Sequence, residues 1–294
     1  GGYHGMSDYG LMSLAPKRLA NFPTPVPDSA GIPKSVRDEV VVAPFNDLAA
    51  VESLLNQHGK DIAAIIVEPF QRLIPPKPGF LEGLRKLTEQ HGIVLIFDEV
   101  VTGFRFSYGG AQAYYGVTPD LATFGKVIGG GFPLAAVAGK AEIMRHFDQT
   151  AVPQDEFTGK IGTLSGNPIA SAAGLATMEV LKAPGAYEKI FATGKALMSG
   201  ISARLREAKV AAQVIGEPPL FDVVFADGDI RDYRSTVRAN ADVMRRVNQS
   251  LLASGILKGE SKYYLSLAHT EADVAQTLGA WDTAIRALKD AKAA

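Results

Sequence analysis

The sequence predicts an α/β protein with a mostly parallel sheet and helices on both of its faces, followed by a smaller α+β domain. Short apolar runs at residues 62–67 and 93–97 are typical of parallel strands, which are buried on both faces. They alternate with helical periodicity at residues 47–58 and 80–91, the pattern of a sheet with crossover helices. The 294 residues are enough for such a domain and a second, smaller one.

The first half of the chain has clear boundaries. Residues 14–46 are rich in proline and glycine and lack periodicity, so we expect a long irregular segment there. Gly59 and Gly92 are stop signals for the first two helices, and Pro69 ends the first strand. Two further strands are expected at residues 121–124 and 134–138.

The second half has a different texture, with antiparallel-type strands between long helices. The predicted elements are helices at 167–181, 186–208, 233–254 and 270–288 and strands at 221–225 and 263–268. We therefore expect a large domain over residues 1–183 and a small C-terminal α+β domain over residues 184–294.

The composition excludes several classes of function. Apolar residues make up 47% and charged residues 21%, and the net charge of −1 without long runs of one sign indicates no nucleic-acid or membrane partner. The absence of cysteine removes thiolate nucleophiles and disulfides and fits a reducing cytoplasm. The five histidines have no ligand-like spacing, so we predict no metal site.

Asp98 is the first candidate for chemistry, because it ends the apolar run 93–97. Ligands of open α/β sheets bind outside the carboxyl ends of the strands. A carboxylate buried there needs a positive or protonated partner. The alternative is an aspartate that caps the next helix.

Lys126 is the second candidate, between the apolar strand 121–124 and the glycines 129–131. An amine held among apolar groups loses its proton more easily, and a neutral lysine can form a Schiff base with a carbonyl. The alternative is a surface lysine in a glycine-rich loop. Together, Lys126 and Asp98 are the pair that pyridoxal phosphate (PLP) requires, a lysine for its aldehyde and an acid for its ring nitrogen.

Five motifs in order make the chain recognisable. They are Gly2-Tyr-His-Gly5, Ile65-Ile-Val-Glu-Pro69, Asp98-Glu-Val-Val-Thr-Gly-Phe-Arg105, Phe124-Gly-Lys-Val-Ile-Gly-Gly-Gly-Phe-Pro133 and Gly162-Thr-Leu-Ser-Gly-Asn-Pro168. Over nearly its whole length the chain resembles the class III aminotransferases, most closely the glutamate-1-semialdehyde aminomutase branch. The resemblance implies the fold-type I architecture of PLP-dependent transferases and a homodimer with shared active sites.

The resemblance also implies roles for single residues. Lys126 would hold PLP and later move a proton as acid and base, and Asp98 would pair with the pyridine nitrogen. Val100 and Tyr3 would pack on the two faces of the ring. Thr163 would reach the phosphate of the cofactor in the partner subunit.

The other matching positions are less specific. Glu68 would lie near the active site and orient the region of Asp98, and His4 would fix the turn around Tyr3. Many class III enzymes carry glutamine where this chain has Val101, so we assign no partner to the 3′-oxygen of the cofactor. Alternatives stay open: Tyr3 could be a core residue, Thr163 a helix-entry residue and Glu68 a strand-end carboxylate without chemistry.

The family has a long segment before the Gly-Tyr-His-Gly motif, with the main phosphate loop at a helix start. We therefore expect that the N-terminal part is missing here and that residues 1–294 alone turn over poorly. The leading prediction is a transaminase that moves an amino group from an amino acid or amine to an oxo acid or aldehyde. The rivals are an intramolecular 2,1-aminomutase, which needs no second substrate, and an inactive fragment or relative that only binds a partner.

Overall fold

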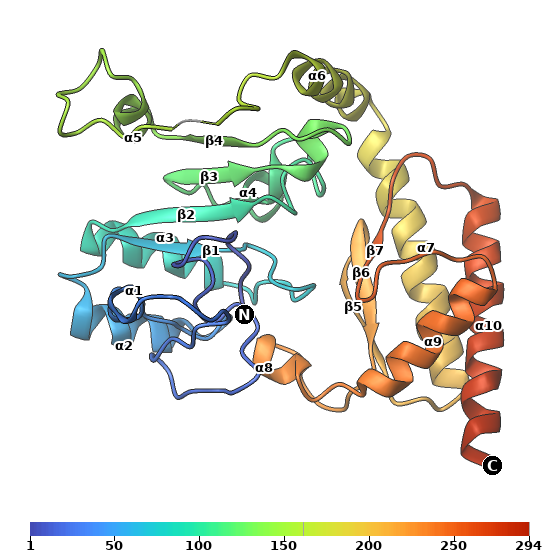
Figure 1. Ribbon diagram of the computed structural model, residues 1–294. Coiled ribbons are helices and arrows are strands. Elements are labelled where there is room, and N and C mark those ends of the chain that lie inside the picture. The colour runs from blue at the N-terminus through green and yellow to red at the C-terminus, as the bar shows by residue number, and fades with distance from the viewer. Residues whose placement is uncertain (161, 294) are drawn as a thin grey trace. The chain divides into compact units, whose positions relative to one another are not determined.

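The structure is a computed structural model that describes residues 1–160 and 162–293. These residues form two compact units, Gly1–Gln71 with Pro76–Ala183, and Arg72–Pro75 with Pro184–Ala294 (Figure 1). The first unit contains every residue predicted to form the site. That residues 1–183 and 184–294 are separate domains stays a prediction.

The first unit is built on a four-stranded sheet in the order β1-β2-β3-β4 (Figure 1). Strands β1 (Ala64–Val67), β2 (Val94–Glu99) and β3 (Leu121–Phe124) are parallel, and β4 (Ala136–Gly139) is antiparallel to β3. The predicted mostly parallel α/β sheet is therefore confirmed. Because β2 lies between two strands, its Leu95 is fully buried, and parallel pairing brings the carboxyl ends of β1, β2 and β3 to one edge.

Helices cover this sheet, and their ends follow local signals. They are α1 (Lys34–Asp38), α2 (Leu48–His58), α3 (Phe80–His91), α4 (Gly110–Tyr115), α5 (Ala141–Met144) and α6 (Pro168–Lys182), with 3₁₀ turns η1 (Lys126–Gly129) and η2 (Arg145–Phe147). Asp47 caps α2 by accepting a hydrogen bond from the amide of Ala50, and Gly92 ends α3 at φ 67°. The prediction missed α4, because its start is held by a distant side chain described below.

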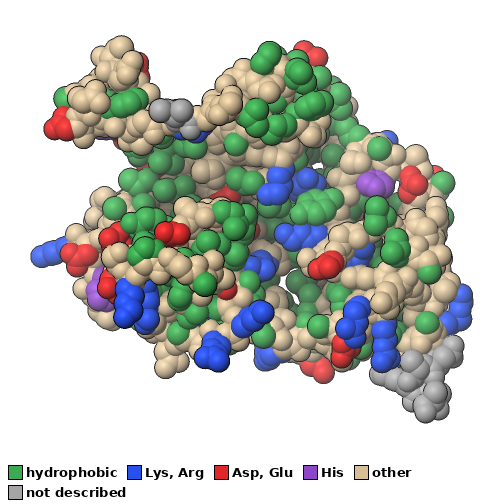
Figure 2. Space-filling model, in the orientation of Figure 1, with side chains coloured by type: hydrophobic (Ala, Val, Ile, Leu, Met, Phe, Trp, Pro, Cys, Tyr) green, Lys and Arg blue, Asp and Glu red, His purple; other side chains and the backbone are tan. Residues whose placement is uncertain are grey.

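Helix α6 is apolar on two sides. Ala170 and Gly174 are buried toward η1, whereas Ile169, Leu175 and Val180 are 63%, 68% and 55% exposed. Figure 2 shows the hydrophobic side chains that gather over this helix.

The second unit has an antiparallel sheet in the order β5-β6-β7, with helices packed against it and one another. Its elements are α7 (Ala186–Glu207), β5 (Gln213–Glu217), β6 (Leu220–Val224), α8 (Tyr233–Thr236), α9 (Ala241–Ala253), β7 (Tyr263–Tyr264) and α10 (Glu271–Ala293). Trp281 is fully buried in this core, and its indole N–H donates to the Tyr263 hydroxyl at 3.0 Å.

Two expectations for this unit were wrong, and one strand was missed. The helix expected at 233–254 is two helices, because Asn240 caps α9 through the amide of Val243 and donates its own amide to the carbonyl of Phe225. The strand expected at 263–268 pairs only over Tyr263–Tyr264. Strand β5 was not predicted, since Gly216 interrupts its apolar pattern with φ 122°.

No helix in the described part of the chain has the length and apolar character to cross a membrane.

Candidate active site

Asp98 lies at the carboxyl end of β2, as predicted, and it is only 7% exposed. Its Oδ2 lies 2.9 Å from Nδ1 of His4. Its Oδ1 accepts hydrogen bonds from the amide of Val100 at 3.1 Å and from the Thr123 hydroxyl at 3.3 Å. No lysine or arginine among the described residues pairs with this buried carboxylate. A histidine and neutral donors alone therefore face it.

Lys126 lies at the same edge of the sheet. Asp98 pairs with Thr123 in the β2–β3 register, and Lys126 follows three residues later at the first position of η1. The preceding Gly125 is extended and buried, and a Cβ built there would lie 3.3 Å from Cγ1 of Val100. The turn of Lys126 therefore packs directly on the residue that follows the Asp98-Glu99 pair.

Of the two environments left open for Lys126, apolar surroundings or the surface of a glycine-rich loop, the structure shows the second. The residue is exposed, and its φ of +48° places the side chain on a left-handed turn that leaves the strand. Within the described residues its ammonium makes no hydrogen bond or ion pair. The amine is thus free to react with a ligand.

The N-terminal motif is held at this edge by two carboxylates. The amide of Tyr3 donates to Oε1 of Glu68 at 2.6 Å, and His4 contacts Asp98 as above. Glu68 follows β1 and is 9% exposed, while the Tyr3 side chain is 46% exposed. Tyr3 is therefore not a core residue, and Glu68 positions it. His4 does more than was expected of it, because it contacts the carboxylate of Asp98 itself.

Glu99 was not singled out from the sequence, although it is fully buried. Successive strand residues point to opposite faces, so Glu99 leaves β2 on the side away from Asp98. It accepts hydrogen bonds from the amides of Ala111 and Gln112 at the start of α4. Burial raises the pKa of the Glu99 carboxyl more than these hydrogen bonds lower it. The residue anchors the segment from β2 to α4, which carries Val100.

Thr163 is not brought to this cluster by any contact. It is exposed, in the loop before α6, and makes no hydrogen bond within the described residues. Asn167 caps α6 by accepting from the amides of Ile169 and Ala170, so the cap is Asn167 rather than Thr163.

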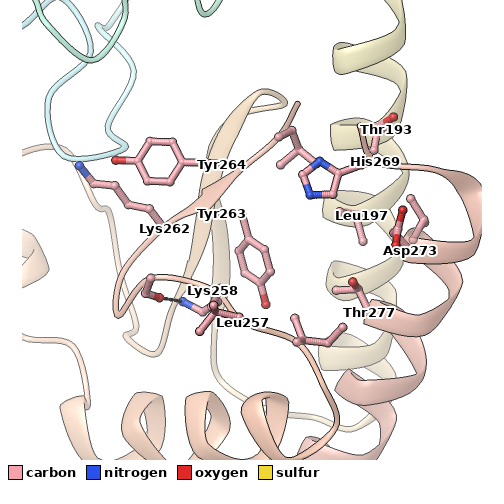
Figure 3. Close-up of a pocket in the computed structure, with 14 residues that line it drawn as sticks. Thr193, Leu197, Leu257, Lys258, Lys262, Tyr263, Tyr264, His269, Asp273 and Thr277 are labelled. Atoms are coloured by element: carbon pink, nitrogen blue, oxygen red, sulfur yellow. Dashed lines mark hydrogen bonds between the residues drawn. The ribbon is translucent and has the colours of Figure 1, made fainter. Parts of the chain in front are cut away.

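A pocket in the second unit offers a contrast to Lys126. It is lined by residues of α7, β7 and α10, and none of the residues predicted for the site lines it (Figure 3). Its Lys258 is almost fully buried, and the amine donates to both carboxylate oxygens of Asp222 and to the carbonyl of Gly259. All three ammonium protons are used, so Lys258 stabilises the fold and is not available as a nucleophile.

No group of three or more histidine or acidic residues with suitable positions is found in residues 1–160 and 162–293.

Known proteins of one family match the chain closely. The family profile described as class III aminotransferase matches residues 1–260. Glutamate-1-semialdehyde 2,1-aminomutase of Natranaerobius thermophilus is 39% identical over 292 residues, which cover 97% of this chain and 66% of that protein. An omega-transaminase from Sphaerobacter thermophilus superimposes with a TM-score of 0.88 at 38% identity, over 97% of this chain and 66% of that one. A transaminase solved with PLP bound gives 0.87 at 28% identity, over 100% and 67%. The chain thus spans about two thirds of the length of these relatives.

Proposed function

The chain belongs to the class III aminotransferases, and from this membership we propose that it transfers amino groups with PLP at the edge of the sheet where Asp98 and Lys126 lie. The observation that carries the proposal is that a buried carboxylate, which no lysine or arginine of the described residues contacts, lies at the same sheet edge as a lysine that has no partner among those residues.

The residues present fit the cofactor. A buried carboxylate is costly unless a positive or protonated group faces it, and Asp98 faces neither lysine nor arginine. A protonated ring nitrogen supplies that group. The amine of Lys126, which has no partner among the described residues, suits an aldehyde. Because Gly125 has no side chain, the turn that carries Lys126 can lie close to Val100.

Each side chain then has a defined task. PLP, when bound, supplies an aldehyde and a ring that withdraws electrons from the bond to be broken. The Lys126 amine would hold the cofactor through its aldehyde and, as a base and then an acid, would accept and return a proton during the transfer. Asp98 keeps a proton on the ring nitrogen, and His4 holds the second oxygen of that carboxylate in place.

The remaining residues orient the ring and complete the site. Val100 and Tyr3 cover its two faces, and Glu68 holds the backbone of Tyr3. Thr163 would bind the phosphate of the cofactor in a partner subunit, which agrees with its exposure and with its lack of a hydrogen-bond partner among the described residues. We therefore also propose a homodimer with shared sites, active in the cytoplasm on small amino donors and oxo acceptors.

An intramolecular aminomutase is the second candidate, because a relative that is 39% identical has that activity in its name. The 38% identical structure is named an omega-transaminase, so similarity alone does not separate the two reactions. An assay with one substrate separates them. An aminomutase rearranges glutamate semialdehyde over many turnovers without an acceptor, whereas a transaminase releases more than one equivalent of oxo acid per site only when an acceptor is added.

The site is tested by Lys126→Ala. The wild-type protein, mixed with PLP, is expected to show the visible absorption band of a lysine-bound cofactor, and the variant to lack it. Lys86→Ala, which removes an exposed lysine of α3, serves as the matched control and should keep the band. A band of equal strength in wild type and Lys126→Ala contradicts the proposal.

A further inference from the structure

The turn that carries Lys126 lies against the backbone of α6. A Cβ built on Gly174, in the middle of that helix, would lie 2.4 Å from the carbonyl oxygen of Ile128 and 3.0 Å from Cδ2 of Leu134. The first distance is shorter than any carbon–oxygen contact a side chain can keep. Only glycine therefore allows this approach.

The helix itself gives no other reason for a glycine here. Gly174 has an ordinary helical φ, so any residue could adopt its backbone conformation. Glycine also lowers helix stability relative to alanine, which is plentiful elsewhere in α6. The space between Gly174 and Ile128 is the feature that requires it.

A second glycine completes the contact from the other side. Gly130, which follows η1 at φ +56°, would carry a Cβ 2.5 Å from the Thr177 hydroxyl and 2.8 Å from the carbonyl oxygen of Ala173. Thr177 and Ala173 lie on α6 beside Gly174. The backbones of the turn and of α6 are thus in close contact at two neighbouring positions, Gly174 with Ile128 and Gly130 with Ala173.

This contact bears on Lys126 because η1 is a single short turn. Ile128 is two residues after Lys126, and the turn spans only Lys126–Gly129, so a shift of the Ile128 carbonyl moves the lysine as well. Lys126 has a φ of +48°, a conformation that non-glycine residues keep only when their surroundings impose it. Val100 confines the turn on the β2 side, next to Gly125.

We propose that Gly174 is a positioning residue for Lys126: it sets the distance between α6 and η1, and thereby the direction in which the lysine amine meets the cofactor aldehyde. This inference rests on the proposed function. It assigns a role to a buried glycine that carries no functional group.

The test is Gly174→Ala, read by the visible band of lysine-bound PLP. We expect the variant to bind PLP at least about tenfold more weakly, because a misplaced reactive group forms its bond less favourably. We also expect the pH midpoint of the band to shift by about one unit. Gly279→Ala is the matched control, since Gly279 also lies in a helix but a Cβ added there would meet nothing within 4 Å. It should leave both readings unchanged.

A double variant separates a backbone effect from side-chain crowding. Leu134→Ala removes the Leu134 side chain but cannot move the carbonyl of Ile128, so Leu134→Ala/Gly174→Ala should remain as impaired as Gly174→Ala. Restoration of the wild-type band by Leu134→Ala overturns the proposal, and so does a Gly174→Ala protein with unchanged affinity and pH midpoint.

Two further outcomes are also decisive. If Gly174→Ala does not fold, Thr177→Met applies a milder push on Gly130 from the same helix, and it should shift the same two readings in the same direction; no shift overturns the proposal. If the wild-type protein shows no band that depends on Lys126, the proposed function fails first, and the role of Gly174 fails with it.

Discussion

Asp98 and Asp120 are both nearly buried in the same sheet, at 7% and 5% exposure, but they have different partners. Asp120 precedes β3 at the amino ends of the parallel strands and pairs with Arg85 at 2.9 Å and Lys140 at 2.8 Å. Asp98 lies at the carboxyl ends, where its partners among residues 1–160 and 162–293 are a histidine and two neutral donors. One carboxylate is neutralised by two cationic side chains of the fold, and the other has no lysine or arginine partner among the described residues.

The comparison shows how a buried charge indicates function. Burial alone would raise the pKa of Asp120, but the hydrogen bonds from Arg85, Lys140 and the Leu95 amide outweigh it and lower the pKa to about 2. Such a group stabilises the fold and has no reason to react. The same residue type without a lysine or arginine partner is a candidate for binding.

The largest effect is expected from Asp98→Asn. The amide cannot hold a proton on the ring nitrogen, so turnover should fall about a thousandfold. The amide still accepts hydrogen bonds, so the free energy of unfolding without cofactor should change by less than about 1 kcal/mol. Steady-state rates and denaturant unfolding measure the two quantities. Near-normal rates would show that Asp98 is no more catalytic than Asp120.

Asp120→Asn should have the opposite pattern. It removes the buried charge partner of the poorly exposed Arg85, which keeps only the exposed Glu89 among the described residues, and this should cost about 3 kcal/mol of stability. Turnover per folded molecule should stay within about twofold, because the sites are far apart along the strands. A large loss of turnover at unchanged stability would remove the distinction between the two aspartates.

Acid unfolding sharpens the same test. The folded pKa of Asp120 is lowered, so its contribution is complete above pH 4 and is lost as pH falls toward 2. The lost stability is roughly 2 kcal/mol in the wild-type protein. The Asp120→Asn variant should lack this loss. Unfolding curves at pH 2, 3 and 4 give the free energy of unfolding of both proteins. If that free energy falls equally with pH in the two, the assignment to Asp120 is wrong.

The smallest effect should come from His4→Asn, which removes the ring that faces Oδ2 of Asp98. One hydrogen bond to a charged group accounts for about 1.5 kcal/mol, so turnover should fall about tenfold, and its pH profile should change. His58→Asn, at the exposed end of α2, is the control and should behave as wild type. A variant at His4 with wild-type rates and pH profile would reduce that contact to a structural one.

Much of the fold could be predicted from local pattern. The strands up to β3 are continuous apolar runs that end in Pro69, Asp98 and Gly125, and the main helices begin and end at recognisable caps. The break between α8 and α9 was missed because Asn240 acts through a hydrogen bond to Phe225, which is distant in sequence. Periodicity contains no information about such a contact.

The candidate site also contains residues that local sequence predicts and contacts that it does not predict. Asp98 and Lys126 stand out because each follows a strand that predicts its place at the sheet edge. The contact of His4 with Asp98 joins residues 94 positions apart, and the anchoring of α4 by Glu99 joins residues 12 and 13 positions apart. The left-handed turn of Lys126 packs against α6, a helix about forty residues later that a sequence window around the lysine does not include.

The tetrapeptide Arg72–Pro75 has a consequence for dissecting the molecule. It follows β1 by only a few residues but belongs to the second unit, where Leu73 and Ile74 are almost completely buried. The polypeptide therefore passes between the units three times, and neither unit is a single continuous stretch of the sequence. A piece that starts at Pro184 would lack two apolar side chains of its own core, so cleavage after Ala183 cannot yield two intact halves.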